Sequence, residues 1–424
     1  MVDERQRQSG LTAGGLTDIL PDGNSHVGIY IHIPFCIKKC DYCDFLSGPA
    51  TGETQSAYVQ ALIREIRLNR DVKSRYLVKT VFFGGGTPSI LPGQTVADIL
   101  TVLRECFNFD RDGEVEISLE ANPGTVTAEK LSLWKAAGVN RLSFGLQSAD
   151  NRELKLLGRI HTYEQFLESW ELADRAGYRN RNIDLMSALP GQTAESWERT
   201  LKTVAALGPE HLSAYSLIIE EGTPFYHRFA GPESPDFALL PDEDEEREMY
   251  RLTGLALKKY GYRRYEISNY ARPGFACRHN CGYWEGVQYL GFGAGAASYI
   301  MKVDDVTEPQ METQIKPYIR LRNVDNTAEY IRRMKLDISS VEERMTLTGE
   351  NRMEEFMFLG LRMEKGISFQ NFRQRFGCSF SRIYGEVTEK LKGQGLVAET
   401  EEGIRLTDYG IDVSNYVFEA YLLS

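Results

Sequence analysis

Several features that mark special classes of protein are missing from the sequence. No apolar run approaches the roughly 20 residues that cross a bilayer, which excludes an integral membrane protein. Residues 1–26 are polar and lack the apolar core of an export signal, so we expect a disordered tail on a cytoplasmic protein. Cysteine is scarce, with seven in 424 residues. This odd, clustered set excludes a disulfide scaffold and fits a reducing compartment.

Positive charge is also in short supply. The chain has 49 Lys and Arg residues against 60 Asp and Glu residues, which gives a formal net charge of −11. That balance disfavours a general nucleic-acid or anionic-membrane surface, so no nucleic-acid partner is predicted. Hydrophobic residues make up 42% of the chain, enough for one large α/β domain and a smaller one.

Three of the cysteines lie close together. Cys36, Cys40 and Cys43 form the pattern C-x3-C-x2-C just after an apolar run at 28–33, which predicts a buried strand that Pro34 ends. Thiolates this close in sequence suit a soft metal centre. Three ligands can hold three irons of a four-iron cluster and leave one iron open. The alternatives are unrelated buried thiols or a zinc loop that lacks its fourth ligand.

Strand-like and helix-like segments then alternate about six times as far as residue 219. This alternation predicts a parallel sheet with right-handed crossovers. We expect an α/β fold, a partial (β/α)6 TIM-like barrel, with a complete eight-stranded barrel as the alternative. Three helices and two short strands after residue 351 predict a small winged-helix-like module. The expected domains are a core at 27–310, which includes the segment at 279–284, and a C-terminal domain at 311–424.

Glycine and polar residues follow several of the predicted strands. Gly85, Gly86 and Thr87 come directly after one strand, where glycine lets a backbone approach a ligand closely, although such a run is more often a turn. Four polar side chains stand at or soon after other strand ends: Glu120, Gln147, Arg159 and Asp184. Parallel α/β folds place active sites at these ends, whereas any one such residue alone is more often a cap or a surface residue.

Together these motifs resemble the radical S-adenosylmethionine (SAM) superfamily. The segments LEANPGT, SFGLQS, NIDLM and LPGQT resemble the oxygen-independent coproporphyrinogen III oxidase-like family, over roughly residues 27–424. The resemblance implies a [4Fe–4S] cluster on the three cysteines, whose open iron binds the amino and carboxylate groups of SAM. Reductive cleavage of SAM would then give a 5′-deoxyadenosyl radical.

The resemblance also suggests a role for each polar residue. It places Gly85, Gly86 and Thr87 at the amino group of SAM, and Glu120 at its ribose hydroxyls. Tyr30 and Tyr42 would flank SAM, although the family often has Phe at the second position. A second SAM or the substrate would lie among three further residues: Gln147, Arg159 and Asp184.

His279 begins the pattern HNxxYW, which ends at Trp284. A lone histidine is more often structural, but one beside Tyr283 and Trp284 could ligate haem iron and stack on a porphyrin. The pattern resembles that of HemW-type haem chaperones, a branch of the same family, and implies haem as a further cofactor. Cys277 or Cys281 could supply the ligand instead.

Two functions follow from the resemblance. One is a haem chaperone that keeps the cluster and SAM, binds haem and delivers it to acceptor proteins, with membrane-associated respiratory proteins among the candidates. The other is a coproporphyrinogen III dehydrogenase. Members with that activity carry a further cysteine where this chain has Phe45, and they lack HNxxYW. Both differences favour the chaperone without dehydrogenase activity, while its status as an enzyme stays open.

Overall fold

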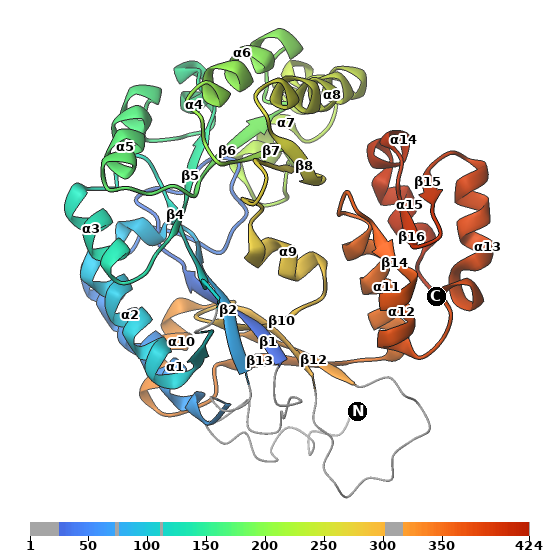
Figure 1. Ribbon diagram of the computed structural model, residues 1–424. Helices are drawn as coiled ribbons and strands as arrows, with labels where there is room; N and C mark the ends of the chain where they lie inside the picture. Colours follow the sequence, from blue (N-terminus) through green and yellow to red (C-terminus); the bar gives the residue numbers. More distant parts are fainter. Residues whose placement is uncertain (1–24, 73–75, 111–112, 302–316, 424) are drawn as a thin grey trace, which may run out of the picture.

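The computed structural model describes residues 25–72, 76–110, 113–301 and 317–423 (Figure 1). Six parallel strands fill its first half, and a helical segment joins each strand to the next. They are β1 (Ser25–Ile33), β2 (Tyr76–Gly85), β4 (Glu116–Ala121), β5 (Arg141–Gln147), β6 (Arg181–Ser187) and β7 (His211–Ser216). Strands that are neighbours in this order pair directly. The predicted sixfold strand–helix repeat is therefore confirmed.

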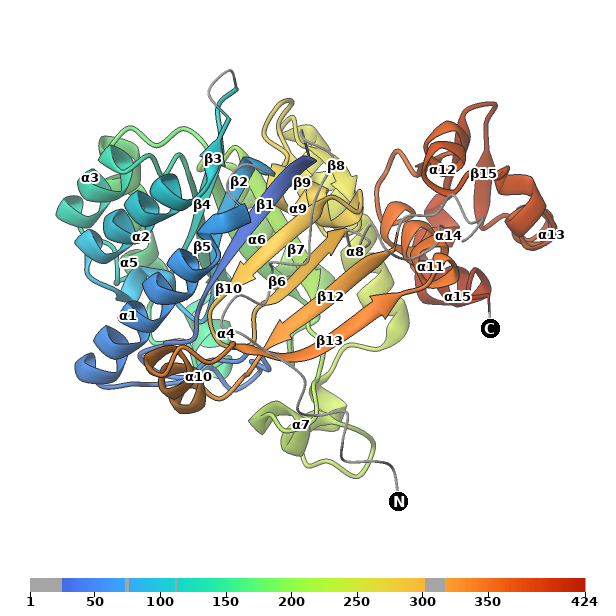
Figure 2. The ribbon, with the colours of Figure 1, turned by 90° about the horizontal axis from the view of Figure 1, so that it is seen from below.

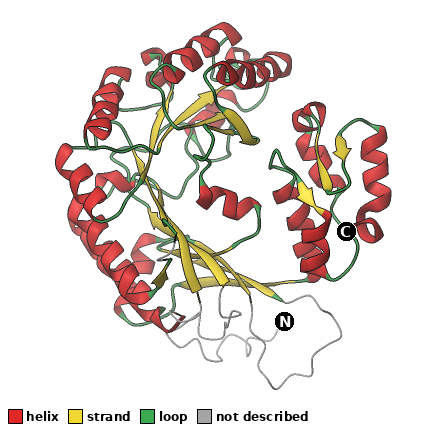
Figure 3. Cartoon of the chain, viewed as in Figure 1, coloured by secondary structure: helices red, strands yellow, loops and turns green. Residues whose placement is uncertain are grey.

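The connecting helices cover the outer face of this curved sheet (Figure 3). They are α1 (Gly52–Leu68), α2 (Gly93–Cys106), α3 (Ala128–Ala136), α4 (Asn151–Leu156), α5 (Tyr163–Arg175) and α6 (Ala194–Ala205). Thr162 and Thr193 open α5 and α6 with capping boxes, which satisfy the first free N–H groups of each helix. Each helix turns apolar side chains inward, as the fully buried Trp134 and Trp197 show, and so seals the outer face of the sheet.

Further strands extend the sheet at both ends. Two lie beyond β7, namely β9 (Asn269–Ala271) and β8 (Arg263–Glu266), and four lie beyond β1, namely β10 (Gln288–Phe292), β11 (Ala297–Met301), β12 (Tyr318–Asn323) and β13 (Val341–Leu347). Figure 2 shows β1, β10, β12 and β13 side by side. β10 is parallel to β1, and the other pairs are antiparallel. Among the described strands β8 and β13 form open edges, so the partial barrel is confirmed and the complete barrel is wrong.

Shorter elements complete this part of the chain. They are β3 (Asn108–Phe109), α7 (Pro224–Phe229), α8 (Glu243–Lys259), α9 (Arg278–Trp284) and α10 (Thr327–Lys335). Helix α9 lies inside the arc of strands rather than on its outer face (Figure 1). Residues 302–316, in the middle of a charged stretch that gave no clear sequence pattern, lie outside the described residues.

The C-terminal segment builds a second, smaller core. Its elements are α11 (Gly349–Gly360), β14 (Ile367–Ser368), α12 (Phe369–Phe376), α13 (Phe380–Gly393), β15 (Val397–Glu399), β16 (Gly403–Leu406), α14 (Asp408–Asp412) and α15 (Ser414–Ala420). The three strands form a separate sheet, and Phe372, Tyr384 and Leu391 are buried together beneath it. This order is the predicted winged-helix-like arrangement. Because β12 and β13 belong to the main sheet, we propose a domain boundary near Thr348 rather than at residue 311.

Two expectations concern membranes and the N-terminus. Within the described ranges, no helix is both long enough and apolar enough to cross a membrane. Of the expected disordered tail, residues 1–24 lie outside the described residues, and Ser25 and His26 begin β1.

Glu65 of α1 joins the added strands to the first repeat. The residue is buried, and its carboxylate accepts hydrogen bonds from the Gly293 amide at 2.8 Å, Asn323 at 2.7 Å, Tyr330 at 2.6 Å and Ser340 at 2.7 Å. Burial nevertheless raises the pKa of Glu65 above its usual value. A buried carboxylate is tolerated here because its oxygens accept hydrogen bonds from all of these neighbouring donors.

We predict that Glu65→Ala lowers the free energy of unfolding by at least ~3 kcal/mol, because each buried donor left without a partner costs about 1–3 kcal/mol. Chemical denaturation followed by circular dichroism measures the change. Gln60→Ala, at an exposed position of the same helix, serves as the control and should change the stability by less than ~1 kcal/mol. Equal midpoints for the two variants would contradict the structural role of Glu65.

Candidate functional site

The cysteine loop leaves the end of β1 and is closed at its base by backbone hydrogen bonds. The Cys36 amide donates to the Gly48 carbonyl at 2.9 Å, and the Gly48 amide donates to the Pro34 carbonyl at 3.1 Å. The middle of the loop is held by the Asp41 amide, which donates to the Leu157 carbonyl at 3.2 Å. A closed base and a fixed centre hold the three cysteines in one short, ordered loop.

Each of two thiols has a polar donor from a distant part of the chain. The Thr87 hydroxyl lies 3.4 Å from the Cys36 sulfur, and the Arg159 guanidinium lies 3.5 Å from the Cys40 sulfur. Hydrogen bonds and positive charge of this kind stabilise a thiolate and tune a cluster that it binds. The third thiol, Cys43, is partly buried, and this burial raises its pKa.

The glycine run after β2 packs directly on the cysteine loop. A Cβ at Gly86 would lie 2.7 Å from the Phe35 carbonyl oxygen and 3.0 Å from the Cys36 sulfur, so only glycine fits there. Gly85 has a φ of +113°, a backbone conformation that side-chain-bearing residues rarely adopt. The glycines therefore let the two strand ends approach each other. Their expected approach to a ligand stays a prediction.

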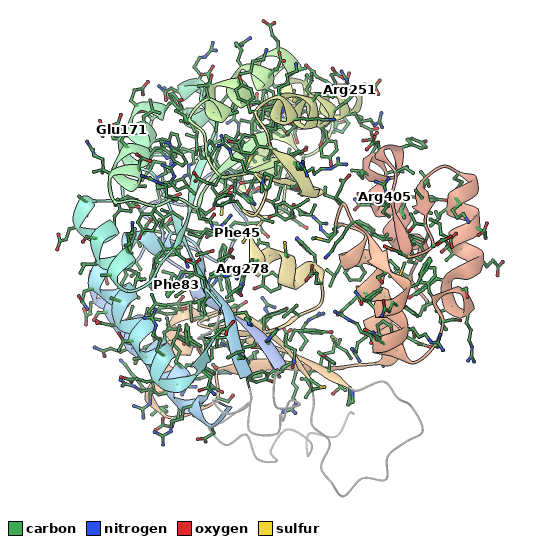
Figure 4. All side chains as sticks on the ribbon, viewed as in Figure 1. Phe45, Phe83, Glu171, Arg251, Arg278 and Arg405 are labelled. Carbon is green, nitrogen blue, oxygen red and sulfur yellow. The ribbon has the colours of Figure 1, made fainter. Side chains whose placement is uncertain are left out.

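One cavity of about 500 Å³ joins most of the predicted site residues. Its lining includes eleven of the thirteen: Cys36, Cys40, Tyr42, Cys43, Gly85, Gly86, Thr87, Glu120, Gln147, Arg159 and Asp184. Most of these residues lie at or just after the carboxyl ends of parallel strands. The exceptions are Asp184, in the middle of β6, and Arg159, in the loop after α4. Phe45, labelled in Figure 4, also lines the cavity and is 68% exposed. Tyr30 and His279 are the two predicted residues that do not line it.

Two carboxyl groups share the floor of this cavity. Burial, with the nearby Asp184 as a second cause, raises the pKa of Glu120 to about 8. The Glu120 carboxylate accepts a hydrogen bond from the Gly85 amide at 3.2 Å. Asp184 also has a raised pKa because it is buried, although Ser143 and Asn182 donate to it at 3.2 and 2.7 Å. Acidic groups held partly neutral suit hydrogen bonding to a polar ligand.

Gln147 stands at a strained position. Its φ is +76°, which is unusual for a residue with a side chain, and it follows an irregularity in the β5–β6 pairing. Its side-chain oxygen accepts a hydrogen bond from the Tyr215 hydroxyl at 2.9 Å. Backbone strain of this kind is often found at ligand sites.

Sequence reasoning missed Asn122, which connects residues that were predicted. Its amide nitrogen donates to Thr87 at 2.7 Å, while its oxygen accepts from Arg159 at 2.8 Å. The residue therefore aligns the two side chains that approach the Cys36 and Cys40 sulfurs. Its position two residues after Glu120, in the segment LEANPGT, was the only available signal.

Tyr30 supports the cysteine loop from behind the cavity. Its hydroxyl lies 3.1 Å from Nδ1 of His32, and Nε2 of His32 lies 3.0 Å from the Leu46 carbonyl oxygen of the loop. The Tyr30 ring stacks on Phe82 with centroids 6.3 Å apart. Both ring nitrogens of His32 therefore have hydrogen-bond partners.

His279 is buried inside the arc, and both of its ring nitrogens have protein partners. Nδ1 lies 2.8 Å from the Thr80 hydroxyl, and Nε2 lies 3.0 Å from the Tyr283 hydroxyl. Burial and the nearby Arg141 lower the pKa of His279 to about 3, so the ring is neutral. A neutral imidazole can bind iron, but a haem could reach His279 in this structure only if Tyr283 gave up its hydrogen bond.

The two cysteines beside His279 are poor ligand candidates. Cys277 is fully buried, and its sulfur lies 3.6 Å from a Glu116 carboxylate oxygen. Burial raises the pKa of both Cys277 and Cys281 to about 12, which disfavours the thiolate form that binds iron.

Among the described residues, no three His, Cys, Asp or Glu side chains converge on a single point as one metal ion requires. A four-iron cluster separates its thiolates, since each sulfur binds a different iron. Three thiols lining one cavity fit that larger group.

Comparisons with known proteins identify the family of this chain. Residues 30–204 match the Radical SAM superfamily, and residues 347–413 match the HemN C-terminal domain. The haem chaperone HemW of Lactococcus lactis is 36% identical over 394 residues, covering 93% of this chain and 97% of that protein. HemW of Bacillus subtilis is also 36% identical, covering 93% and 98%. The chain belongs to the HemW-type branch of the radical SAM superfamily.

A solved structure shares the fold of this branch. Coproporphyrinogen III oxidase (HemN) from Escherichia coli, described as a radical SAM enzyme, is 25% identical to this chain with a TM-score of 0.77. The alignment covers 97% of this chain and 92% of the oxidase. HemW-type and HemN-type proteins thus share one architecture, and the site rather than the fold must separate their functions.

The raised pKa of Glu120 predicts a pH-dependent stability of the cluster-free protein. The folded-state pKa of about 8 exceeds the usual value of 4.5, so this carboxyl group stabilises the fold fully below pH 4.5, and the contribution is lost as the pH rises toward 8. Glu120→Gln, which cannot ionise, should therefore become progressively more stable than wild type between about pH 5 and pH 9. A tenfold difference in proton affinity corresponds to about 1.4 kcal/mol. The free energy of unfolding of Glu120→Gln should therefore exceed that of the wild type by at least ~1 kcal/mol at the upper end of this pH range.

Thermal melts of the wild type, Glu120→Gln and Glu168→Gln across this pH range measure the effect. Glu168 is exposed, so Glu168→Gln is the control. Glu168→Gln should follow the wild-type profile, whereas Glu120→Gln should depart from it at high pH. Parallel pH profiles for all three proteins would contradict the buried, protonated state of Glu120.

Proposed function

We propose that this chain is a haem chaperone that holds a [4Fe–4S] cluster and SAM, binds haem and delivers it to acceptor proteins. The observation that carries the proposal is the similarity, over 93% of this chain, to proteins named haem chaperones. The HNxxYW segment and Phe45 support it. Membrane-associated respiratory proteins are the candidate acceptors, and the proposed location is the cytoplasm.

In this proposal, Cys36, Cys40 and Cys43 would hold three irons of the cluster and leave the fourth iron without a protein thiolate. The donor set fits because the three thiols lie on one loop and line one cavity. Thr87 and Arg159 approach two of the sulfurs and stabilise their negative charge. When bound, the cluster and SAM would supply one-electron chemistry; the protein supplies position, hydrogen bonds and protection from water.

The remaining cavity residues receive proposed roles from their positions. Gly85, Gly86 and Thr87 take the amino group of SAM, and Glu120 takes its ribose hydroxyls. Tyr42 packs along the bound cofactor. Three residues provide the polar wall for a second SAM or another ligand: Gln147, Arg159 and Asp184. Tyr30 acts only through His32 on the cysteine loop, because it does not line the cavity.

The alternative function is the oxidative decarboxylation of coproporphyrinogen III. The fold shared with the Escherichia coli oxidase, at a TM-score of 0.77, is the observation that favours it. Phe45 opposes it: an exposed aromatic ring stands at the cavity where, in the resemblance, the dehydrogenases carry a further cysteine.

We predict that changing any one of Cys36, Cys40 and Cys43 to Ser abolishes the brown [4Fe–4S] chromophore and its spectral response to SAM, because no other described thiol lines the cavity. Anaerobic reconstitution followed by iron and sulfide analysis measures the loss. Cys378→Ser, in the C-terminal unit, is the matched control and should reconstitute fully. Full iron and sulfide content in the triple variant of the cluster cysteines would refute the assignment.

We predict that the reconstituted protein binds haem but converts coproporphyrinogen III at no measurable rate, because it lacks the further cysteine and carries HNxxYW. Haem titration by absorbance and product analysis in the presence of SAM and a reductant are run side by side. The Escherichia coli oxidase is the positive control for turnover. Transfer of bound haem to apomyoglobin tests delivery; protoporphyrinogen formation without haem binding would reverse the choice of function.

A further inference from the structure

A second cavity lies between the barrel and the C-terminal unit. It measures about 300 Å³ and is distinct from the cluster cavity, since no described residue lines both. The barrel side comes from α9, β10, β11 and β12, and the opposite side comes from α11, β14 and α12. Figure 1 shows α9 inside the arc and α11 and α12 across the opening from it. Trp284, the last residue of the HNxxYW pattern, lines this cavity.

The cavity is rich in aromatic side chains. Six line it: Tyr283, Trp284, Tyr289, Tyr299, Phe356 and Phe376. Tyr289 stands edge-on to Tyr283, with centroids 4.6 Å apart, and stacks on Tyr299 at 6.0 Å. The Trp284 indole N–H is buried without a hydrogen-bond partner among the described residues. Aromatic walls with a few polar groups are typical of sites for flat organic ligands.

The charge of this cavity differs in sign from that of the whole chain. Four cationic residues line it, namely Arg320, Arg352, Lys365 and Arg375, together with two carboxylates, Glu285 and Glu355. Arg320 pairs with Glu355 at 3.0 Å and Lys365 pairs with Glu285 at 2.6 Å. Among the described lining residues, the four cations outnumber the two carboxylates. The chain as a whole carries −11. A concentration of positive charge on an acidic protein indicates an anionic ligand.

We infer that this interdomain cavity is the haem site. The inference rests on the proposed haem-chaperone function and adds the location of the ligand. The macrocycle packs against the tyrosine and tryptophan rings, and its two propionates, which carry two negative charges, meet the cationic side of the lining, to which Arg375 belongs. Because a porphyrin is too large to be enclosed in about 300 Å³, part of it stays exposed. A partly exposed ligand suits a protein that must release haem to another protein.

The cluster cavity is a poorer match for the same ligand. Its charged lining consists of three cationic residues (Lys38, Lys39 and Arg159) and four acidic ones (Asp44, Glu120, Asp184 and Glu220), besides the three cysteines. It therefore offers no surplus of positive charge for two propionates. The cluster and SAM would also occupy much of its 500 Å³.

His279 lies behind the interdomain cavity rather than in its lining. Tyr283 stands between them: it lines the cavity, and its hydroxyl lies 3.0 Å from Nε2 of His279. In this arrangement His279 orients Tyr283, so the histidine acts as a positioning residue for the haem wall. The HNxxYW pattern thus contributes its aromatic residues to haem and keeps its histidine in the core.

The test uses full-length protein and two ligands, haem and metal-free protoporphyrin IX, titrated by absorbance and fluorescence. Asn371→Trp, at an exposed position of α12 that lines the cavity, should block it without removing a packed side chain. Arg375→Gln removes one of the surplus cations. We expect each variant to lower the affinity for both ligands about tenfold or more. Asn371→Trp removes space for the ligand, and Arg375→Gln removes a charge-assisted contact.

Matched controls lie on the same helix. Gln374→Trp and Arg373→Gln change exposed neighbours that do not line the cavity, and both should bind haem as the wild type does. Arg375→Lys keeps the charge and should retain most of the affinity. Melting curves and the cluster spectrum of every variant show that fold and cluster are intact.

The outcomes separate the two proposals. Wild-type protein that binds neither haem nor protoporphyrin IX would refute the chaperone function itself. Wild-type haem binding with unchanged affinity in Asn371→Trp and Arg375→Gln would overturn the interdomain site and leave the chaperone function standing. Losses confined to haem, with protoporphyrin IX unaffected, would assign these residues to the iron rather than to the macrocycle and would also overturn the inference.

Discussion

The site depends on the parallel register between β1 and β2. Ile33 pairs with Gly85 at the carboxyl ends of the two strands, so the cysteine loop and the glycine run leave the sheet at the same level. The absent side chain of Gly86 then lets the loop approach until Thr87 reaches the Cys36 sulfur. A shift of one residue would turn every side chain of β1 to the other face. Strand pairing therefore fixes the cluster site before any cofactor binds.

Polar groups from the later strands complete this arrangement. Asn122 holds Thr87 and Arg159 in one network, and the buried Glu120 and Asp184 stand below it. Thr87, Glu120 and Asn122 come from the carboxyl ends of parallel strands or the loops that follow them, as in other parallel α/β folds. Asp184 lies within β6, and Arg159 follows α4. The sheet thus gathers residues far apart in sequence into one cavity of about 500 Å³.

The second half of the chain serves a different purpose. Strands β10 to β13 extend the sheet, and Glu65 ties their connections to α1. Helix α9 enters the concave side, where Tyr283 and Trp284 face the C-terminal unit. The two units together enclose a cavity that neither forms alone. In the proposed function, this separation puts cluster chemistry and haem binding at different places in one molecule.

Much of this could be predicted from the sequence, because the signals are local. Cysteine spacing, the glycine run and the sixfold alternation each depend on residues near one another in the chain. The sequence also indicated the winged-helix-like order after residue 351. Strands β10 to β13 were missed because short strands carry little periodicity, and because β10 joins the sheet through β1, a partner distant in sequence. Only the tertiary structure decided that His279 is buried against Thr80 and Tyr283. Burial and the identity of hydrogen-bond partners arise from packing between segments, which no local pattern encodes.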